Sequence, residues 1–178
     1  MQLLLTQLLN LPGIEVENYS DLDGELILEV EPVTTQAICP RCQQISCHLH
    51  QNHWYLARDL SISGRTVLLK VNRRQFKCQT CGKPFSETLN FIGNRRKQTD
   101  RFAQSIVQQV LHSDVHNVAT QNDLTDEEVW SMVQYIIPIS FLYATDKNVG
   151  SLLRKVFQKR CVAYFFENGI SKKNFKLI

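Results

Sequence analysis

The chain has 178 residues, of which 43% are hydrophobic and 21% charged, and 20 Lys and Arg against 17 Asp and Glu give a formal net charge of +3. This length allows one ordinary domain or two small ones and excludes a large catalytic barrel or a long repeat array. The longest uncharged stretch, residues 129–145, is broken by Pro138 and is shorter than the roughly 20 apolar residues of a membrane span. We therefore expect no membrane association.

The N-terminal segment is apolar, but it has no basic residue before its leucines and no small-residue cleavage site, so it is not typical of a secretory signal. We expect a cytoplasmic protein, whose cysteines stay reduced and can bind metal. The six leucines within residues 3–11 predict a short buried helix, which Pro12 and Gly13 are expected to end.

Two pairs of strands are predicted in the first half of the chain. Residues 14–19 and 25–31 flank a turn, and apolar residues recur at every second position of the second strand, as in a half-buried hairpin. Residues 53–60 and 65–76 form the second pair, joined through a turn that contains Gly64.

Two CxxC motifs, at residues 39–42 and 78–81, lie on either side of the second strand pair. Four thiolates are the number that a closed tetrahedral zinc site requires, and a two-residue spacer lets one turn direct both sulfurs at one ion. The sequence therefore predicts one Zn²⁺ bound by Cys39, Cys42, Cys78 and Cys81. Gly82 is expected to take a positive φ angle after the second motif. An alternative ligand or a second metal remains open for Cys47, His48, His50 and His53.

Residues 65–101 form a basic block with ten Lys and Arg and two acidic residues. Such a block attracts polyanions, and each base that neutralises a DNA phosphate releases counterions. Phe76, Phe85 and Phe91 lie among the bases, which favours nucleic-acid contact over the alternative of a solubilising surface. The candidate phosphate contacts flank the second CxxC motif and its exit: Arg65, Lys70, Arg73, Arg74, Lys77, Arg95, Arg96 and Lys97.

After the basic block the apolar period changes from two to about 3.6, which predicts a helix that begins after Thr99 or Asp100 as its N-cap. Shorter helices are predicted at residues 115–121 and 125–137. The second of these has the sequence of a capping box that starts at Thr125.

Residues 115–134 fit the helix-turn-helix pattern, with Ala119 at the small position where the two helices cross. Asn122 replaces an apolar residue of the pattern, and Asp123 replaces the usual turn glycine. We expect weak base reading by the second helix, because three acidic residues at its start would repel phosphates: Asp126, Glu127 and Glu128. Trp130 is expected in the core.

The motifs occur in a distinctive order. A leucine-rich helix ending in LPG is followed by a hairpin ending in EP, by CPRC, by a strand ending in RDL, and then by RRQFKCQTCGKPFSE and RRKQTDRF. In this order the chain resembles the N-terminal region of ISL-type insertion-sequence transposases, over about residues 3–137. Members of this family carry a zinc ribbon and a helix-turn-helix domain before a catalytic domain.

The resemblance implies a DNA-binding segment that recognises the terminal inverted repeats of a mobile element, with the four CxxC cysteines as zinc ligands. It also implies a prokaryotic, nucleoid-associated protein. The family continues into an RNase H-like domain with an Asp-Asp-Glu metal site. After Pro138, Asp146 and Glu167 are the only acidic residues, and the first catalytic-strand motif is missing. We therefore expect a truncated transposase that is not an enzyme.

The prediction is an α+β chain with an N-terminal helix and β-hairpin over residues 1–37, a zinc ribbon over 38–93, a small all-α helix-turn-helix domain over 94–138 and a divergent helical tail over 139–178. Its partners would be double-stranded DNA at the element ends and, further, an intact transposase or a second copy. The alternative function is a zinc-stabilised protein-interaction module that inhibits or partners an intact transposase.

Overall fold

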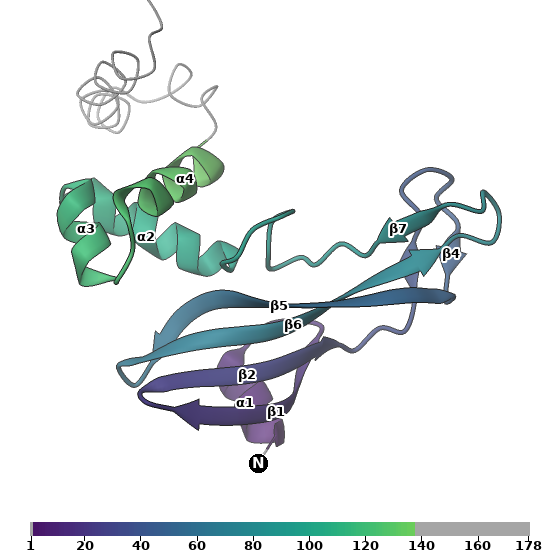
Figure 1. Cartoon of the computed structure of the whole chain (residues 1–178), viewed down its shortest axis with the longest axis horizontal. Helices are drawn as coiled ribbons and strands as arrows, with labels where there is room; N and C mark the ends of the chain where they lie inside the picture. Colours follow the sequence, from purple (N-terminus) through teal and green to yellow (C-terminus); the bar gives the residue numbers. More distant parts are fainter. Residues whose placement is uncertain (1, 138–178) are drawn as a thin grey trace, which may run out of the picture. The chain divides into compact units, whose positions relative to one another are not determined.

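The computed structural model describes residues 2–137, which form strands followed by helices and confirm the α+β class (Figure 1). The chain divides into two compact units, Met1–Ser105 and Ile106–Ile178. The elements in chain order are α1 (Gln2–Leu9), β1 (Ile14–Leu22), β2 (Glu25–Pro32), β3 (Ala37–Ile38), β4 (Ile45–Ser46), β5 (Leu49–Ile62), β6 (Arg65–Lys77), β7 (Pro84–Ser86), α2 (Asp100–His112), α3 (Val115–Gln121) and α4 (Asp126–Ile136). The tail expected over residues 139–178, with Asp146 and Glu167, lies outside the described residues.

The N-terminal unit is built on one sheet with the strand order β1-β2-β6-β5, and β7 pairs with the far end of β6. The strands of each hairpin are antiparallel, whereas β2 and β6 are parallel. Because of this parallel pairing, the segment expected as an N-terminal hairpin and the segment expected as a zinc ribbon share one sheet. The strand β5 also begins earlier than expected, at Leu49 rather than at His53.

Both long hairpins are closed by two-residue turns. The turn between β1 and β2 has Asp23 and Gly24 at φ angles of 46° and 90°, and the turn between β5 and β6 has Ser63 and Gly64 at 51° and 78°. Two successive positive φ angles are typical of the type I′ turn, whose twist matches that of paired strands. These turns confirm the two predicted hairpins and fix the register of each.

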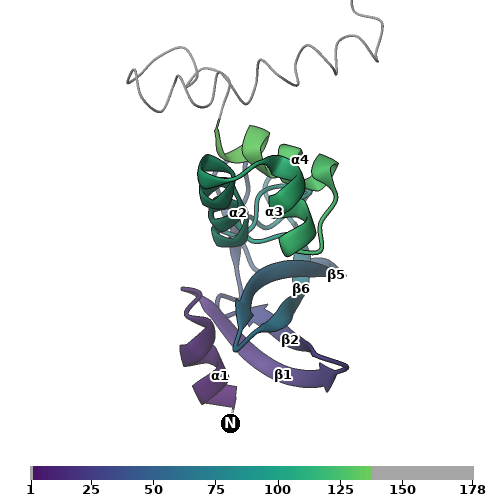
Figure 2. The same cartoon turned by 90° about the vertical axis from the view of Figure 1, so that its left-hand side faces the viewer.

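The hydrophobic core lies on the face of this sheet where α1 packs (Figures 1 and 2). Leu89, Phe91 and Ile92 belong to the same core. Apolar residues alternate into this core along the two central strands. The prediction of a buried leucine helix is wrong for half of α1, because Leu3, Leu4 and Leu8 are 72%, 57% and 61% exposed while Leu9 is buried. The helix is short and touches the sheet with one side only.

A buried carboxylate joins the sheet to the start of α2. Asp59 in β5 is 1% exposed, and its Oδ1 accepts hydrogen bonds from Thr99 Oγ1 at 2.7 Å and from Arg101 Nε at 2.8 Å. Arg101 also donates to the second carboxylate oxygen and, at 2.7 Å, to the carbonyl of Leu9 at the end of α1. Thr99 Oγ1 in turn accepts from the backbone N–H of Phe102, so Thr99 is the helix N-cap.

In the helical unit, the described helices pack around buried apolar residues of α2, α3 and α4, and the two predicted short helices are confirmed. The capping box of Thr125 and Glu128 is present. Asn122, at the position where the pattern expects an apolar side chain, instead donates hydrogen bonds to Gln109 and to the carbonyl of Val118, both at 2.8 Å. None of the helices among residues 2–137 is long and apolar enough to cross a membrane.

We predict that Arg101→Ala lowers the free energy of unfolding by about 3–5 kcal/mol, because it leaves the buried Asp59 carboxylate without its partner. Arg65→Ala is the control, since Arg65 pairs with Asp21 at the surface and both side chains are about half exposed. Its expected cost is below about 1 kcal/mol. Urea unfolding monitored by circular dichroism compares the variants. Equal stability of the two would contradict a structural role for the Asp59 network.

Candidate zinc ribbon and nucleic-acid interface

The two CxxC motifs form matching turns at the ends of strand pairs. In the first, the backbone N–H of Cys39 donates to Gln44 and the N–H of Gln43 donates to the Cys39 carbonyl, both at 2.9 Å. In the second, Cys78 and Gly82 occupy the equivalent positions, with distances of 3.0 and 2.9 Å. The residue after the second cysteine has a φ angle of +60° in Gln43 and +67° in Gly82, which confirms the prediction for the glycine.

These turns bring four sulfur atoms together. The Sγ atoms of the four CxxC cysteines all lie within 4.8 Å of one another, with 3.8 Å between Cys39 and Cys81 and 3.4 Å between Cys42 and Cys78. A tetrahedral zinc with Zn–S bonds of about 2.3 Å places its sulfurs about 3.8 Å apart. Cys39 and Cys78 are each 1% exposed. The donor set, its spacing and its burial therefore fit a closed structural zinc site.

The pKa values of the clustered cysteines also indicate that a cation would stabilise them. The backbone N–H of Cys81 is the main cause that lowers the pKa of Cys78 to about 6. The N–H of Gln44 acts in the same direction on Cys42, but the Cys78 thiol, burial and the other two thiols together raise the pKa of Cys42 to about 11. Four crowded sulfurs cannot all ionise unless a positive charge lies between them.

The aromatic side chains near this cluster are buried. The Phe76 and Phe85 rings pack with centroids 6.1 Å apart, in a small core with Cys39 and Cys78. Phe91 is also buried, in the main core of the sheet. The place of these phenylalanines among the bases therefore does not support nucleic-acid contact, because their side chains fill the ribbon and the sheet.

The histidines near the first motif lie outside the cluster. Among the described residues, the four CxxC cysteines are the group whose geometry could hold a metal ion. Cys47 is exposed, as are His48, His50 and His53, and none of them lies in this group. The alternative of a further ligand among them finds no support in the geometry.

Three of the eight candidate phosphate contacts already pair with carboxylates. Arg65 pairs with Asp21, and Lys70 pairs with Glu29 at 3.2 Å. The Arg74 guanidinium makes two parallel contacts with Glu87, at 2.6 and 3.0 Å, with both side chains largely buried. The count of basic residues in the sequence thus overstates the positive charge that the surface offers to DNA.

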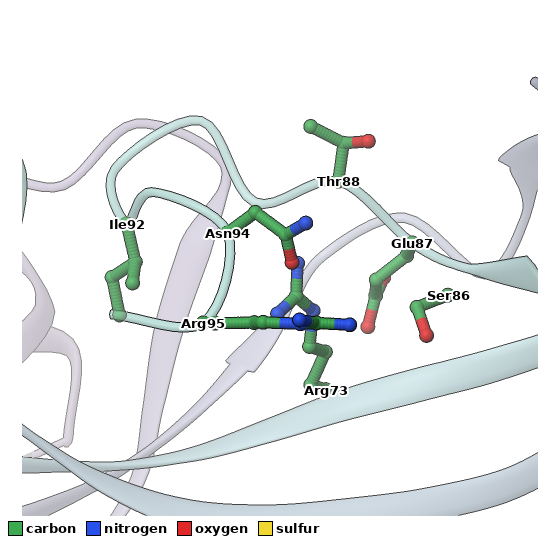
Figure 3. A pocket seen from close by; sticks show the side chains of 7 residues that line it. All are labelled: Arg73, Ser86, Glu87, Thr88, Ile92, Asn94 and Arg95. Atoms are coloured by element: carbon green, nitrogen blue, oxygen red, sulfur yellow. The ribbon is translucent and has the colours of Figure 1, made fainter. Parts of the chain in front are cut away.

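The other five candidates are differently placed. Lys77 and Lys97 are exposed and make no ion pair within residues 2–137, and Arg96 is partly buried. Arg73 and Arg95 line a pocket of about 510 Å³ (Figure 3). Ser86, Thr88 and Asn94 are polar residues of this pocket that the sequence did not single out. The orientation of Arg73 could have been predicted from the sequence. Every second residue of β6 faces the core at positions 67, 69 and 71, and Arg73 is the next residue in this alternation.

The first turn of α4 carries the three acidic residues noted in the sequence, and no basic residue lies in this helix. Glu128 belongs to the capping box, Asp126 lies 3.4 Å from His116, and Glu127 is exposed. Trp130 is partly buried, whereas Val129, Met132 and Val133 are the buried residues of this helix.

The fold and the cysteine cluster define the class of protein: a zinc ribbon followed by a helix-turn-helix domain. Residues 35–81 match the family model described as the zinc-finger of transposase IS204/IS1001/IS1096/IS1165. Residues 87–137 match the helix-turn-helix domain of transposase family ISL3. The described part of the chain therefore carries a zinc ribbon and a helix-turn-helix domain of the kinds found in ISL3-type transposases, and Zn²⁺ is the cofactor of its ribbon.

A curated relative supports the same family. The chain is 33% identical over 108 residues to the "Transposase for insertion sequence element IS1001" of Bordetella parapertussis. The match covers 60% of this chain and 27% of the relative, so the chain spans about a quarter of the length of that protein. No solved structure matches the chain.

We predict one zinc per chain, measured by elemental analysis of the purified protein. Cys78→Ser should lower the zinc content well below one, because a hydroxyl is a poor replacement for a thiolate ligand. Cys47→Ser is the matched control, since Cys47 is exposed and lies outside the cluster, and it should keep the full zinc content. Zinc-free wild-type protein, or equal losses in the two variants, would contradict this site.

Proposed function

We propose that this region binds duplex DNA at the ends of an insertion-sequence element, with Zn²⁺ held by Cys39, Cys42, Cys78 and Cys81. The observation that carries the proposal is the succession, in one chain, of the zinc ribbon and the helix-turn-helix domain of the same transposase family. The element ends are the DNA on which a transposase acts, and the named relative is a transposase of an insertion sequence. Such a protein works on the chromosome, in the cytoplasm of a prokaryotic cell.

The phosphate contacts in this proposal come from the basic residues without a carboxylate partner. Lys77 immediately precedes Cys78, the first ligand of the second zinc-binding turn, and Lys97 lies in the segment before α2. Arg73 and Arg95 line the pocket between β6, β7 and the following segment. Phosphate contacts position a protein on DNA and carry little sequence information, so this surface supports affinity more than selectivity.

The last two helices of the helix-turn-helix domain, α3 and α4, contain no Lys or Arg and contribute little positive charge in this proposal. Its α4 helix begins with three acidic residues, and the exposed Glu127 would repel a phosphate nearby. Selective reading of bases by this helix would depend on polar side chains such as Gln134. We propose that the N-terminal unit, Met1–Ser105, supplies most of the affinity of this region for DNA.

A second candidate function is a protein-interaction module that partners an intact transposase. One observation favours it: the side of α1 that faces away from the sheet exposes Leu3, Leu4 and Leu8. Exposed apolar patches on soluble proteins commonly mark contacts with other proteins. A module of this kind would associate with protein partners without salt-dependent retention on DNA.

The salt dependence of DNA binding tests the proposed function. For the Lys77→Gln, Lys97→Gln double variant, we expect the slope of log K against log salt to fall by up to about 1.8, since each phosphate contact contributes about 0.9. The charge-matched control is Arg65→Gln, Lys70→Gln, which removes two bases that already pair with carboxylates and should change the slope less. Fluorescence anisotropy with a labelled duplex measures both.

Absence of duplex binding by the zinc-loaded chain at low salt would reject the proposal and favour the protein-interaction module. Equal loss of slope in the two double variants would keep DNA binding but reject the assignment of Lys77 and Lys97 as specific contacts.

A further inference from the structure

We propose that the pocket lined by Arg73 and Arg95 is a seat for one phosphate group of the DNA backbone. This inference rests on the proposed function and assigns a particular site within it. The pocket lies wholly in the N-terminal unit, where β6 supplies Arg73 and residues 86–95 supply the opposite wall. Figure 3 shows the two arginine side chains directed into the pocket, with Asn94 above them.

Two guanidinium groups that face one pocket repel each other, and this arrangement is favourable when an anion lies between them. The Arg73 Nε atom is buried and has no hydrogen-bond acceptor among the described residues. A buried donor without an acceptor is costly, and a small movement of the Arg73 side chain toward an anion in the pocket would satisfy it. A phosphodiester offers two negatively charged oxygens, which match the planar fork of an arginine.

The acidic residue of the pocket does not oppose this role. Both carboxylate oxygens of Glu87 accept hydrogen bonds from the Arg74 guanidinium, and Oε1 also accepts from the backbone N–H of Arg74 at 2.7 Å. The charge of Glu87 is thereby compensated by Arg74, which leaves the two pocket arginines as a net positive charge. Ser86 and Thr88 add hydroxyl donors beside it.

The loop that carries Arg95 is held in place by its backbone. The N–H of Arg96 donates to Gly93 at 3.1 Å, and the N–H of Gly93 donates to the Asp100 side chain at 3.1 Å. Arg95 itself has a φ angle of +60°, which is uncommon for a residue with a side chain and recurs at ligand sites. The Arg95 side chain is therefore presented from a fixed backbone.

A free phosphate and a DNA phosphate present similar charged oxygens to the pocket. The experiment therefore uses both as probes. The zinc-loaded full chain is titrated with a duplex and, separately, with inorganic phosphate at constant ionic strength, while the Nε–Hε resonance of Arg73 is followed by NMR. We expect a shift with the duplex that is lost in Arg95→Asn, because asparagine tolerates the positive φ angle but lacks the guanidinium. Lys83→Gln removes an exposed base outside the pocket and should retain the shift.

The salt dependence of duplex binding by single and double variants then shows how many phosphates Arg73 and Arg95 contact. If Arg73 and Arg95 hold one phosphate, Arg95→Asn alone and Arg95→Asn with Arg73→Gln lower the salt slope by the same amount, about 0.9. Two independent contacts would lower it by about 1.8 in the double variant and overturn the single seat. Zinc content and the circular dichroism spectrum verify that the ribbon and the rest of each variant are folded.

The outcomes separate this inference from the proposed function. Duplex binding without a shift of Arg73, or with a shift that Arg95→Asn retains, overturns the pocket and leaves DNA binding in place. No duplex binding, together with a shift by inorganic phosphate, rejects DNA as the ligand and shows a site for free phosphate. No shift with either probe overturns the site altogether.

Discussion

The pairing of β6 with three other strands is the constraint on which the N-terminal unit depends. This strand pairs with β5 along almost its whole length, with β2 over residues 66–71 and with β7 at its end. Along its 13 residues it contributes Val67, Leu69 and Val71 to the core, then Arg73 to the pocket, and it ends immediately before Cys78. A slip of one residue would exchange the two faces of the strand. Core, pocket and metal ligand therefore depend on the same register.

The zinc site and the main core stabilise different parts of this sheet. The main core has fourteen buried residues and no cysteine, whereas the ribbon core contains two cysteines, Phe76 and Phe85. So small a cluster buries too little apolar area to hold two turns in place without a metal ion. The ribbon end of β6 is consequently ordered by zinc, and the opposite end by hydrophobic packing. Two hydrogen bonds also connect the segments that carry the cysteine turns. The Ser46 hydroxyl donates to the carbonyl of Lys77, and the backbone N–H of Lys77 donates to the carbonyl of His48.

Much of the local structure could be predicted from the sequence, because its signals lie within a few residues of one another. The two glycine-containing turns, the CxxC pairs with Gly82, and the capping box of Thr125 are of this kind. The parallel pairing of β2 with β6 could not be predicted, since it joins segments about 40 residues apart and no single position marks it. The exposed leucines of α1 were missed for a similar reason, because which helix side meets a sheet is a tertiary property.

The basic block shows that the candidate site, too, could be predicted only in part from the sequence. From sequence, Arg74 and Lys77 are equivalent positive charges, yet one is buried against Glu87 and the other is exposed. The three phenylalanines among the bases are typical of stacking surfaces in composition, but alternation and the cysteine turns direct them inward. The pocket itself arises from residues 73 and 86–95, which only the fold brings together.

Amide hydrogen exchange before and after zinc removal tests most directly the claim that metal orders only the ribbon end of the central strand. We expect the backbone amides of Cys78 and Gly82 to lose their protection in chelator, while those of Leu69 and Val71 keep theirs. Loss of protection along the whole of β6, to the same extent at Val71 as at Gly82, would contradict it.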